Sequence, residues 1–328
     1  MRAGSIRTEE FRFPSADGHT PIFARAWLPD DTEALFIVQI AHGMVDFIDR
    51  YDAFARFLCG NGGAVYGNDH LGHGHTTLAG EPFGFFGYPH GDELVVEDMH
   101  QLSEIAGQRH PGLPLFLFGH SMGSLLARDY AVRYGSGTAG AVYCGTSGAN
   151  SLTGLVRFLA RVGFCFGRRR KPAHLLSYLA FSKYNDRIPS PRTANDWLTR
   201  DEAVVDAYCA HPWNTFKFTD QAAYDFACLV DRVSGEDWAR TLPQEPAYFL
   251  ISGGMDPVGD YGRGVQEVYG WMQQAGLPDV RLKIYPEARH ELTNELNRQE
   301  VYADVLTWIM DHVPATRLSE GTPGLAAP

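Results

Sequence analysis

The segment Leu-Phe-Leu-Phe-Gly-His-Ser-Met-Gly at positions 115–123 constrains the fold of this chain more than any other feature. It begins with an apolar run of strand length, and apolar residues at helical spacing follow it. Ser121 lies between Gly119 and Gly123, which have no Cβ atom and so permit a sharp turn and close packing. The segment therefore predicts a strand, a tight turn that carries Ser121, and a helix.

The composition is that of a globular protein with a full core. Of the 328 residues, 45% are hydrophobic and 20% are charged, which suits one large α/β domain with an insertion, or two smaller domains. The net charge of −11 argues against nucleic acid as a partner, because phosphate binding needs a basic surface.

Cysteine usage and the distribution of apolar segments indicate the compartment. The cysteines are widely spaced with no C-x-x-C pair, which favours reduced thiols over a disulfide framework or a zinc site. They are Cys59, Cys144, Cys165, Cys209 and Cys228. The first ten residues lack the apolar stretch of a signal peptide, and no later segment has about 18 uninterrupted apolar residues. We expect a cytoplasmic protein that is neither secreted nor inserted across a membrane.

Apolar runs alternate with helix-period segments along most of the chain, a pattern typical of a mostly parallel sheet covered by helices. The predicted strands are 35–41, 64–67, 115–118, 139–144, 247–251 and 280–285. The predicted helices are 49–59, 92–109, 121–134, 261–275 and 294–312. Asp17-Gly18 predicts an opening antiparallel hairpin over 11–28, whose pairing Pro14 and Pro21 weaken near the turn. With this hairpin, about eight strands are expected.

One interval breaks the alternation. From 149 to 238 the pattern is helical and rich in aromatic residues, with no convincing strand. We interpret it as a helical cap inserted into the sheet domain, which then comprises 1–148 and 239–313. The tail 314–328 contains several proline and glycine residues and is predicted to be disordered.

Ser121 fits the G-x-S-x-G nucleophile elbow, in which the serine hydroxyl needs a histidine base that is itself held by a carboxylate. The partners follow in the order serine, acid, histidine, each just after a strand. Asp256 follows the strand expected at 247–251, and His290 follows the strand expected at 280–285. Alone, Asp256 reads as a turn residue and His290 as a surface histidine. Their joint placement favours the triad Ser121, Asp256 and His290.

Acyl transfer also needs two donors aimed at the developing oxyanion, usually backbone N–H groups. Met122 begins the helix after the nucleophile, so its amide is the first candidate. The second is Met44, in the loop after the strand at 35–41, where Gly43 lets the backbone turn. The ordinary interpretation of His42-Gly43 is a strand-ending turn and nothing more.

Three histidines in the glycine-rich stretch 69–75 raise the question of a metal site. Their positions, His70, His73 and His75, match neither H-E-x-x-H nor a Cys/His zinc pattern. We therefore expect a structural loop near the site, with no metal and no cofactor.

The predicted cap contains an apolar stretch at 152–166 with Arg157 and Arg161, followed by the basic run 168–171. The favoured interpretation is a packed helix followed by a solvated, charged turn. The alternative is an interfacial lid whose basic end meets anionic headgroups or a phosphate on the substrate.

Together these motifs resemble the monoacylglycerol lipase and lysophospholipase branch of the α/β-hydrolase superfamily, over about residues 11–313. The resemblance rests on 42–44, 69–75, 119–123, 254–258 and 288–295. It implies an α/β-hydrolase fold, with Ser121 as nucleophile, His290 as base and Asp256 as its orienting acid. It also implies that the amides of Met44 and Met122 bind the oxyanion. One departure is His75, where many relatives carry a small or polar residue.

Family resemblance leaves the substrate open, because this scaffold hosts lipases, esterases, thioesterases and aminopeptidases. Aromatic side chains in the predicted cap favour an acyl chain. They are Phe158, Phe164, Phe166, Tyr178, Phe181, Trp197, Trp213, Phe216 and Phe218. The leading expectation is hydrolysis of a monoacylglycerol, lysophospholipid or similar single-chain ester through an acyl-enzyme, with transient membrane-surface contact through the cap.

Two alternatives stay open. An aminopeptidase related to proline iminopeptidases would need cap carboxylates to hold a substrate amino group, and Glu202, Asp206 and Asp225 are available. A non-catalytic binding module on the same fold would leave the triad unused. Dehalogenases and epoxide hydrolases are disfavoured, because they have Asp at the position of Ser121.

Overall fold

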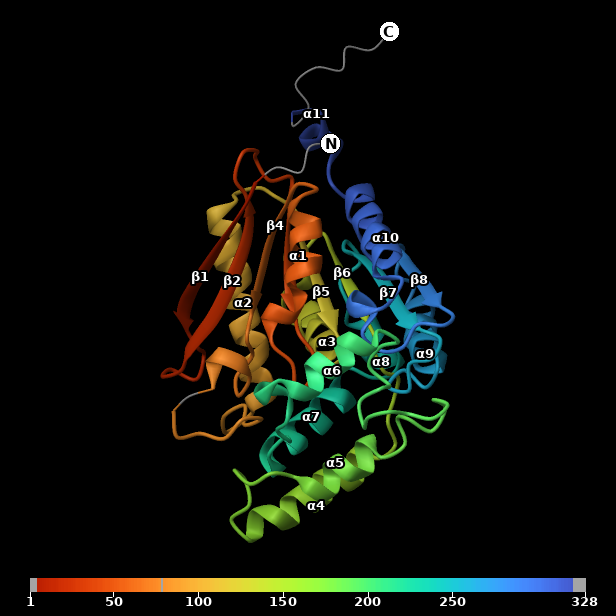
Figure 1. Ribbon diagram of the computed structural model, residues 1–328. Coiled ribbons are helices and arrows are strands. Elements are labelled where there is room, and N and C mark those ends of the chain that lie inside the picture. The colour runs from red at the N-terminus through yellow and green to blue at the C-terminus, as the bar shows by residue number, and fades with distance from the viewer. Residues whose placement is uncertain (1–4, 78, 321–328) are drawn as a thin grey trace.

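The computed structural model describes residues 5–77 and 79–320. In this part of the chain eight strands form one sheet, in the order β1-β2-β4-β3-β5-β6-β7-β8 (Figure 1). The strands are β1 (Ile6–Pro14), β2 (Pro21–Pro29), β3 (Phe36–Ala41), β4 (Gly63–Asn68), β5 (Leu115–His120), β6 (Gly140–Cys144), β7 (Ala247–Gly253) and β8 (Val280–Tyr285). Strand β2 runs antiparallel to β1 and β4, while β4, β3 and β5 to β8 pair in parallel. The predicted mostly parallel sheet is confirmed.

The opening hairpin pairs over its whole length. Pro14 ends β1 and Pro21 begins β2, and the two prolines face each other in the register. They therefore lie at the end of the ladder, where a missing N–H interrupts no interior hydrogen bond, and the expected weakening near the turn is not seen. The Asp17 side chain closes the turn by accepting the N–H groups of His19 and Thr20 at 2.8 and 2.7 Å.

Helices cover both faces of the sheet, which explains why the inner strands β3, β4, β5, β6 and β7 are buried along almost their whole length. On one face lie α2 (Gly91–Arg109), α3 (Met122–Tyr134), α8 (Glu236–Arg240) and α9 (Arg263–Gln274). On the other lie α1 (Asp52–Cys59) and α10 (Arg298–Asp311), which follows the 3-10 turn η5 (Leu292–Asn294). Each face of the sheet has its own hydrophobic core. Strand β5 contributes to both, because Leu117 belongs to the core on the first face whereas Phe116 and Phe118 belong to the core on the second.

Between β6 and β7 the described chain forms helices joined by turns and loops, with no strand and one isolated bridge between Pro172 and Thr219. We call residues 149–238 the cap segment. It contains α4 (Thr153–Cys165), α5 (His174–Phe181), α6 (Glu202–Ala210) and α7 (Asp220–Arg232). In Figure 1, α4 and α5 lie at the end of the molecule opposite the two termini. Ala160 of α4, Leu176 of α5 and Ala223 of α7 share a small core of their own.

The tail differs from the expectation at its start. Residues predicted to be disordered form a short helix, α11 (Ala315–Glu320), and residues 321–328 lie outside the described part. The Arg317 amide donates to Pro314 O at 2.9 Å, and its guanidinium donates to Gly112 O at 3.3 Å. Proline at the start of a helix is pre-organised for the first turn, and the Gly112 contact ties this turn to the core. These two features explain why the residues form a helix.

Candidate active site

The predicted strand, turn and helix are present, with Ser121 at the turn between β5 and α3. Its backbone angles are φ 54° and ψ −120°, a conformation that costs energy for a residue other than glycine. Gly123 permits this geometry, because a Cβ there would lie 2.1 Å from Ala41 O. The helix after the nucleophile is therefore packed directly on the end of β3, which brings Ser121 next to the loop that follows β3.

The acid and the base of the predicted triad meet. His290 Nδ1 lies 3.0 Å from Asp256 Oδ2, and both side chains are almost wholly buried. Asp256 Oδ1 accepts the Val258 N–H at 2.8 Å, which fixes the carboxylate in the loop after β7. Ser121 and His290 line the same cavity. The arrangement can hold the imidazole in one tautomer beside the serine, with Nδ1 toward the acid.

The two predicted oxyanion donors flank Ser121. Met122 is the first residue of α3, so its N–H has no intrahelical acceptor. Met44 follows Gly43, whose position is tight, since a Cβ there would lie 3.3 Å from Ser121 Cβ. Met44 and Met122 both line the cavity that Ser121 lines. The next residue, Val45, has φ 54°, a second strained position beside the serine.

A buried ion-pair network that sequence reasoning missed supports the loop after β3. Arg50 binds Glu291 through two hydrogen bonds of 2.8 and 2.6 Å and Asp46 through a third of 2.8 Å. The Tyr51 hydroxyl donates to Asp46 Oδ2 at 2.8 Å and lies 2.8 Å from His120 Nδ1. Burial would raise the pKa of Asp46, but the interactions with Arg50, His42 and His120 together outweigh burial and hold that pKa well below its usual range.

This network joins the three parts of the site. Asp46 belongs to the loop after β3, His120 precedes Ser121, and Glu291 follows His290 in sequence. His120 Nε2 lies 3.3 Å from His290 O, and burial is the main reason why the pKa of His120 falls to about 4. The signal available in the sequence was Glu291 in the 288–295 motif, but its partner Arg50 is 241 residues away.

The histidine-rich loop at 69–75 packs against the loop after β3. The rings of His42 and His70 are 4.1 Å apart between centroids, and those of His42 and His73 are 5.1 Å apart. Burial is the largest cause that lowers the pKa of His73 to about 3 and that of His70 well below its usual value. His75 instead binds Asp69 at 3.2 Å, which raises its pKa. The described residues contain no group of three or more His, Cys, Asp or Glu side chains able to hold a metal.

A cavity of about 1130 Å³ lies over Ser121 and His290. The cap segment forms most of its apolar wall, including Leu152, Val156, Leu176, Phe226 and Val230. Of the aromatic residues singled out in the sequence, Tyr178, Phe181, Trp197, Phe216 and Phe218 line the cavity, whereas Phe158, Phe164, Phe166 and Trp213 are absent from its wall. Asp46 and Glu291 give it a polar region beside the serine.

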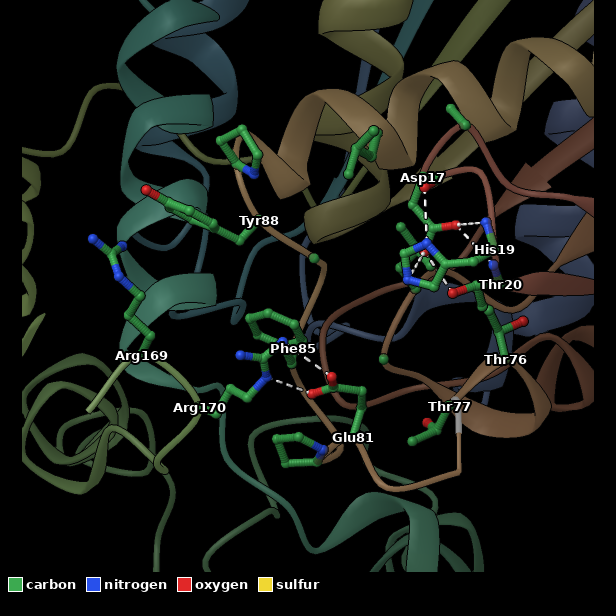
Figure 2. Close-up of a pocket in the computed structure, with 17 residues that line it drawn as sticks. Asp17, His19, Thr20, Thr76, Thr77, Glu81, Phe85, Tyr88, Arg169 and Arg170 are labelled. Carbon is green, nitrogen blue, oxygen red and sulfur yellow. Dashed lines mark hydrogen bonds and ion pairs between the residues drawn. The ribbon is translucent and has the colours of Figure 1, made fainter. Parts of the chain in front are cut away.

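A second cavity, of about 420 Å³, lies between the β1–β2 turn, the loop at 81–89 and the basic run of the cap (Figure 2). The basic run is the exposed, charged turn that we favoured from the sequence, since Arg168, Arg170 and Lys171 are exposed, but its arginines also have partners. Arg168 pairs with Asp220 at 2.9 Å, Arg170 pairs with Glu81 at 2.7 Å, and the Arg169 guanidinium lies 4.5 Å from the centre of the Tyr88 ring. Asp220 and Glu81 lie 52 and 89 residues away in sequence from the arginines that they bind. They tie this run to the rest of the molecule, and the local sequence pattern does not reveal them.

The family model described as "Serine aminopeptidase, S33" matches residues 32–297. The chain belongs to this family. The monoacylglycerol lipase of Mycolicibacterium smegmatis is 30% identical over 90% of this chain and 95% of its own length. The monoglyceride lipase of Homo sapiens is 28% identical over 90% of this chain and 88% of its own length. These relatives confirm the resemblance to the monoacylglycerol lipase branch of the α/β hydrolases.

Solved structures with a similar fold superpose over nearly the whole chain. A carboxyl esterase from Bacillus coagulans, in complex with glycerol, has a TM-score of 0.87 and 32% identity over 94% of this chain and all of its own. The monoglyceride lipase of Saccharomyces cerevisiae, in complex with a substrate analog, has a TM-score of 0.72 at 18% identity over 96% of this chain and 97% of its own. At that identity the likeness concerns the fold alone.

Proposed function

We propose that this protein is a serine ester hydrolase of the monoacylglycerol lipase type, which cleaves single-chain lipid esters through an acyl-enzyme intermediate. The observation that carries the proposal is the cavity over Ser121, which joins a polar region at the serine to a long apolar wall. Its volume of about 1130 Å³ exceeds the roughly 300–1,000 Å³ of ordinary small-molecule sites and leaves room for a long acyl chain. The curated relatives at 28–30% identity carry the same activity in their names.

The proposed reaction begins when Ser121 Oγ attacks the ester carbonyl while His290 Nε2 takes its proton. Asp256 holds the imidazole through Nδ1 and stabilises the imidazolium that forms. The N–H groups of Met44 and Met122 bind the oxyanion of the tetrahedral intermediate. His290 then protonates the departing alcohol, the acyl group stays on Ser121, and a water molecule activated by His290 releases the fatty acid.

The cap carboxylates that an aminopeptidase would need do not reach the cavity. Glu202 and Asp206 pair with Arg192, Asp225 accepts from the Gln221 amide, and none of the three belongs to the described wall. These three carboxylates therefore give an aminopeptidase no amino-group site, while the carboxylates that do line the cavity are Asp46, Asp260, Glu267 and Glu291.

We also propose that the outer face of α4 makes transient contact with a lipid surface. Leu155, Phe158, Val162 and Phe166 recur at helical spacing and are exposed, with 62% of Phe158 and 78% of Phe166 accessible. Arg168 and Arg170 of the neighbouring basic run pair with carboxylates, so the contact we propose is mainly apolar. No helix among the described residues is long and apolar enough to span a bilayer. A cytoplasmic location stays our expectation.

Vesicle flotation tests the lipid contact. The double variant Phe158→Ser, Phe166→Ser should float with phosphatidylcholine vesicles much less than wild type, because it removes two exposed apolar side chains. Leu296→Ser, at an exposed apolar position outside the cap segment, is the control and should float like wild type. Equal flotation of all three proteins would discard the contact.

The hydrolase proposal is tested with monoolein and Ser121→Ala. Turnover should fall by several orders of magnitude, on the order of 10⁶-fold if the triad acts as a unit. Ser177→Ala, at another serine that lines the cavity, is the control and should keep turnover near wild type. Hydrolysis that survives in Ser121→Ala would overturn the proposal.

A further inference from the structure

Arg128 is a buried charge without a counter-ion. It lies in the second turn of α3 after the nucleophile, is wholly inaccessible to solvent, and forms no ion pair with any described carboxylate. Burial is the main cause that lowers its pKa to about 9, against the influence of Tyr143 and Glu267, so that the guanidinium stays protonated near neutral pH. A buried unpaired charge is costly, and an apolar side chain of similar size would avoid that cost.

The contacts of Arg128 join the two segments at which the chain leaves the sheet for helices α4 to α7 and returns from them. We call residues 145–152, between β6 and α4, the first linker, and residues 233–235, between α7 and α8, the second linker. Nη1 donates to Ser147 O at 2.9 Å and to Thr146 Oγ1 at 3.3 Å in the first linker. Nη2 donates to Val233 O in the second linker. One guanidinium therefore holds both linkers at once.

Aromatic faces complete the surroundings of the guanidinium. Its central carbon lies 4.2 Å from the centre of a Trp238 ring and 5.9 Å from that of a Trp271 ring. The Trp238 indole N–H in turn donates to Arg128 O at 3.4 Å. A planar fork with several fixed donors can span two carbonyl acceptors and stack on a ring, which the single ammonium of a lysine cannot do.

The linkers shape the substrate cavity. Ser147, Gly148 and Ala149 of the first linker line it, and so does Val230, three residues before the second linker contact. The Ala149 N–H also donates to Glu267 Oε2 at 3.2 Å, so the first linker is held from both sides. A shift of either linker would move α4 or α7 and change the width of the apolar wall.

We propose that Arg128 is a positioning residue that fixes both linkers and thereby sets the acyl chain length that the cavity accepts. This inference rests on the proposed ester hydrolase function. Arg128 has no access to the cavity, so it acts through the linkers and touches neither the substrate nor the reacting atoms.

The test compares p-nitrophenyl butyrate and p-nitrophenyl laurate as substrates for wild type and Arg128→Met, which keeps most of the side-chain length but has no N–H donor. The long ester depends on the cap wall and the short ester does not. For Arg128→Met we expect KM for the laurate to rise about 10-fold with kcat within about 3-fold, and kcat/KM for the butyrate to stay within about 3-fold. The matched control is Arg133→Met on the same helix. The Arg133 guanidinium pairs with Glu93, Glu97 and Asp129 rather than with the linkers, so the ratio of kcat/KM for the laurate to that for the butyrate should stay at the wild-type value.

Two results would overturn the inference: a laurate to butyrate ratio unchanged within about 2-fold, or equal losses for both esters, which indicate a general structural role. Should Arg128→Met fail to fold, Arg128→Lys decides. It keeps the charge but can hold only one linker, so an intermediate change of the ratio supports the inference and an unchanged ratio refutes it. Failure of the proposed function is distinct, since wild type would then neither hydrolyse butyrate nor react with a fluorophosphonate at Ser121.

Discussion

Gly123→Ala is the sharpest test of the elbow geometry. The added Cβ would lie 2.1 Å from Ala41 O and 2.7 Å from His42 O, both backbone atoms that cannot turn away as a side chain can. Ordinary contacts of Cβ atoms begin at 3.4 Å, so α3 and the end of β3 must separate by about 1.3 Å. The helix carries the Met122 amide and the loop after β3 carries that of Met44. The substitution therefore moves the two proposed oxyanion donors apart.

A misplacement of about 1 Å at a catalytic group costs roughly 100-fold in rate, and we expect kcat for p-nitrophenyl butyrate to fall by about that factor in Gly123→Ala. Overpacking should also lower the free energy of unfolding by about 1–3 kcal/mol, measured by urea titration. Gly270→Ala in α9 is the control, because its Cβ meets nothing within 4 Å and should leave kcat unchanged. A folded Gly123→Ala protein with kcat within about 3-fold of wild type would refute this account of the elbow.

Two further predictions concern buried charge. Arg50→Met leaves Asp46 and Glu291 buried without their cation, and should lower the free energy of unfolding by about 3–5 kcal/mol, measured by urea titration. A loss below about 1 kcal/mol would show that the network is not coupled to stability. Because the pKa of His73 is lowered to about 3 in the folded protein, the unfolded chain binds the His73 proton more tightly than the folded chain does. The stability that His73 contributes is therefore greatest above pH 6.5, where His73 is neutral in both states, and is lost as the pH falls. Between pH 6.5 and 5 the loss of stability due to His73 amounts to about 1–2 kcal/mol, and His73→Phe, which keeps the aromatic packing, should lose about that much less than wild type over the interval. An identical pH dependence of the two proteins would contradict the assignment.

The sequence predicted the elements whose signal is local. Continuous apolar runs placed the strands of the sheet, because strands covered on both faces need no alternation. Ser121, Asp256 and His290 were predictable for the same reason, since each follows a strand whose position is readable and the parallel sheet brings those ends together. The elbow glycines were predictable because close backbone approach demands them.

Features that depend on distant partners were not predictable. The Arg50–Glu291 pair spans 241 residues, and the Arg128 contact with Val233 spans 105. In the sequence Arg128 is one residue of an ordinary helix, and only the folded chain shows that both linkers converge on it. The ion-pair partners of the basic run at 168–171 were not predictable for the same reason, because Asp220 and Glu81 lie on other elements.

The central claim, that Ser121 carries the acyl group during turnover, is tested by rapid acid quench of the enzyme with monoolein, followed by peptide mass spectrometry. The account predicts an oleoyl adduct on the peptide that contains Ser121, formed within the first turnover and absent from Ser121→Ala. Turnover of monoolein with no adduct on Ser121, or with an adduct on another residue, would contradict the claim.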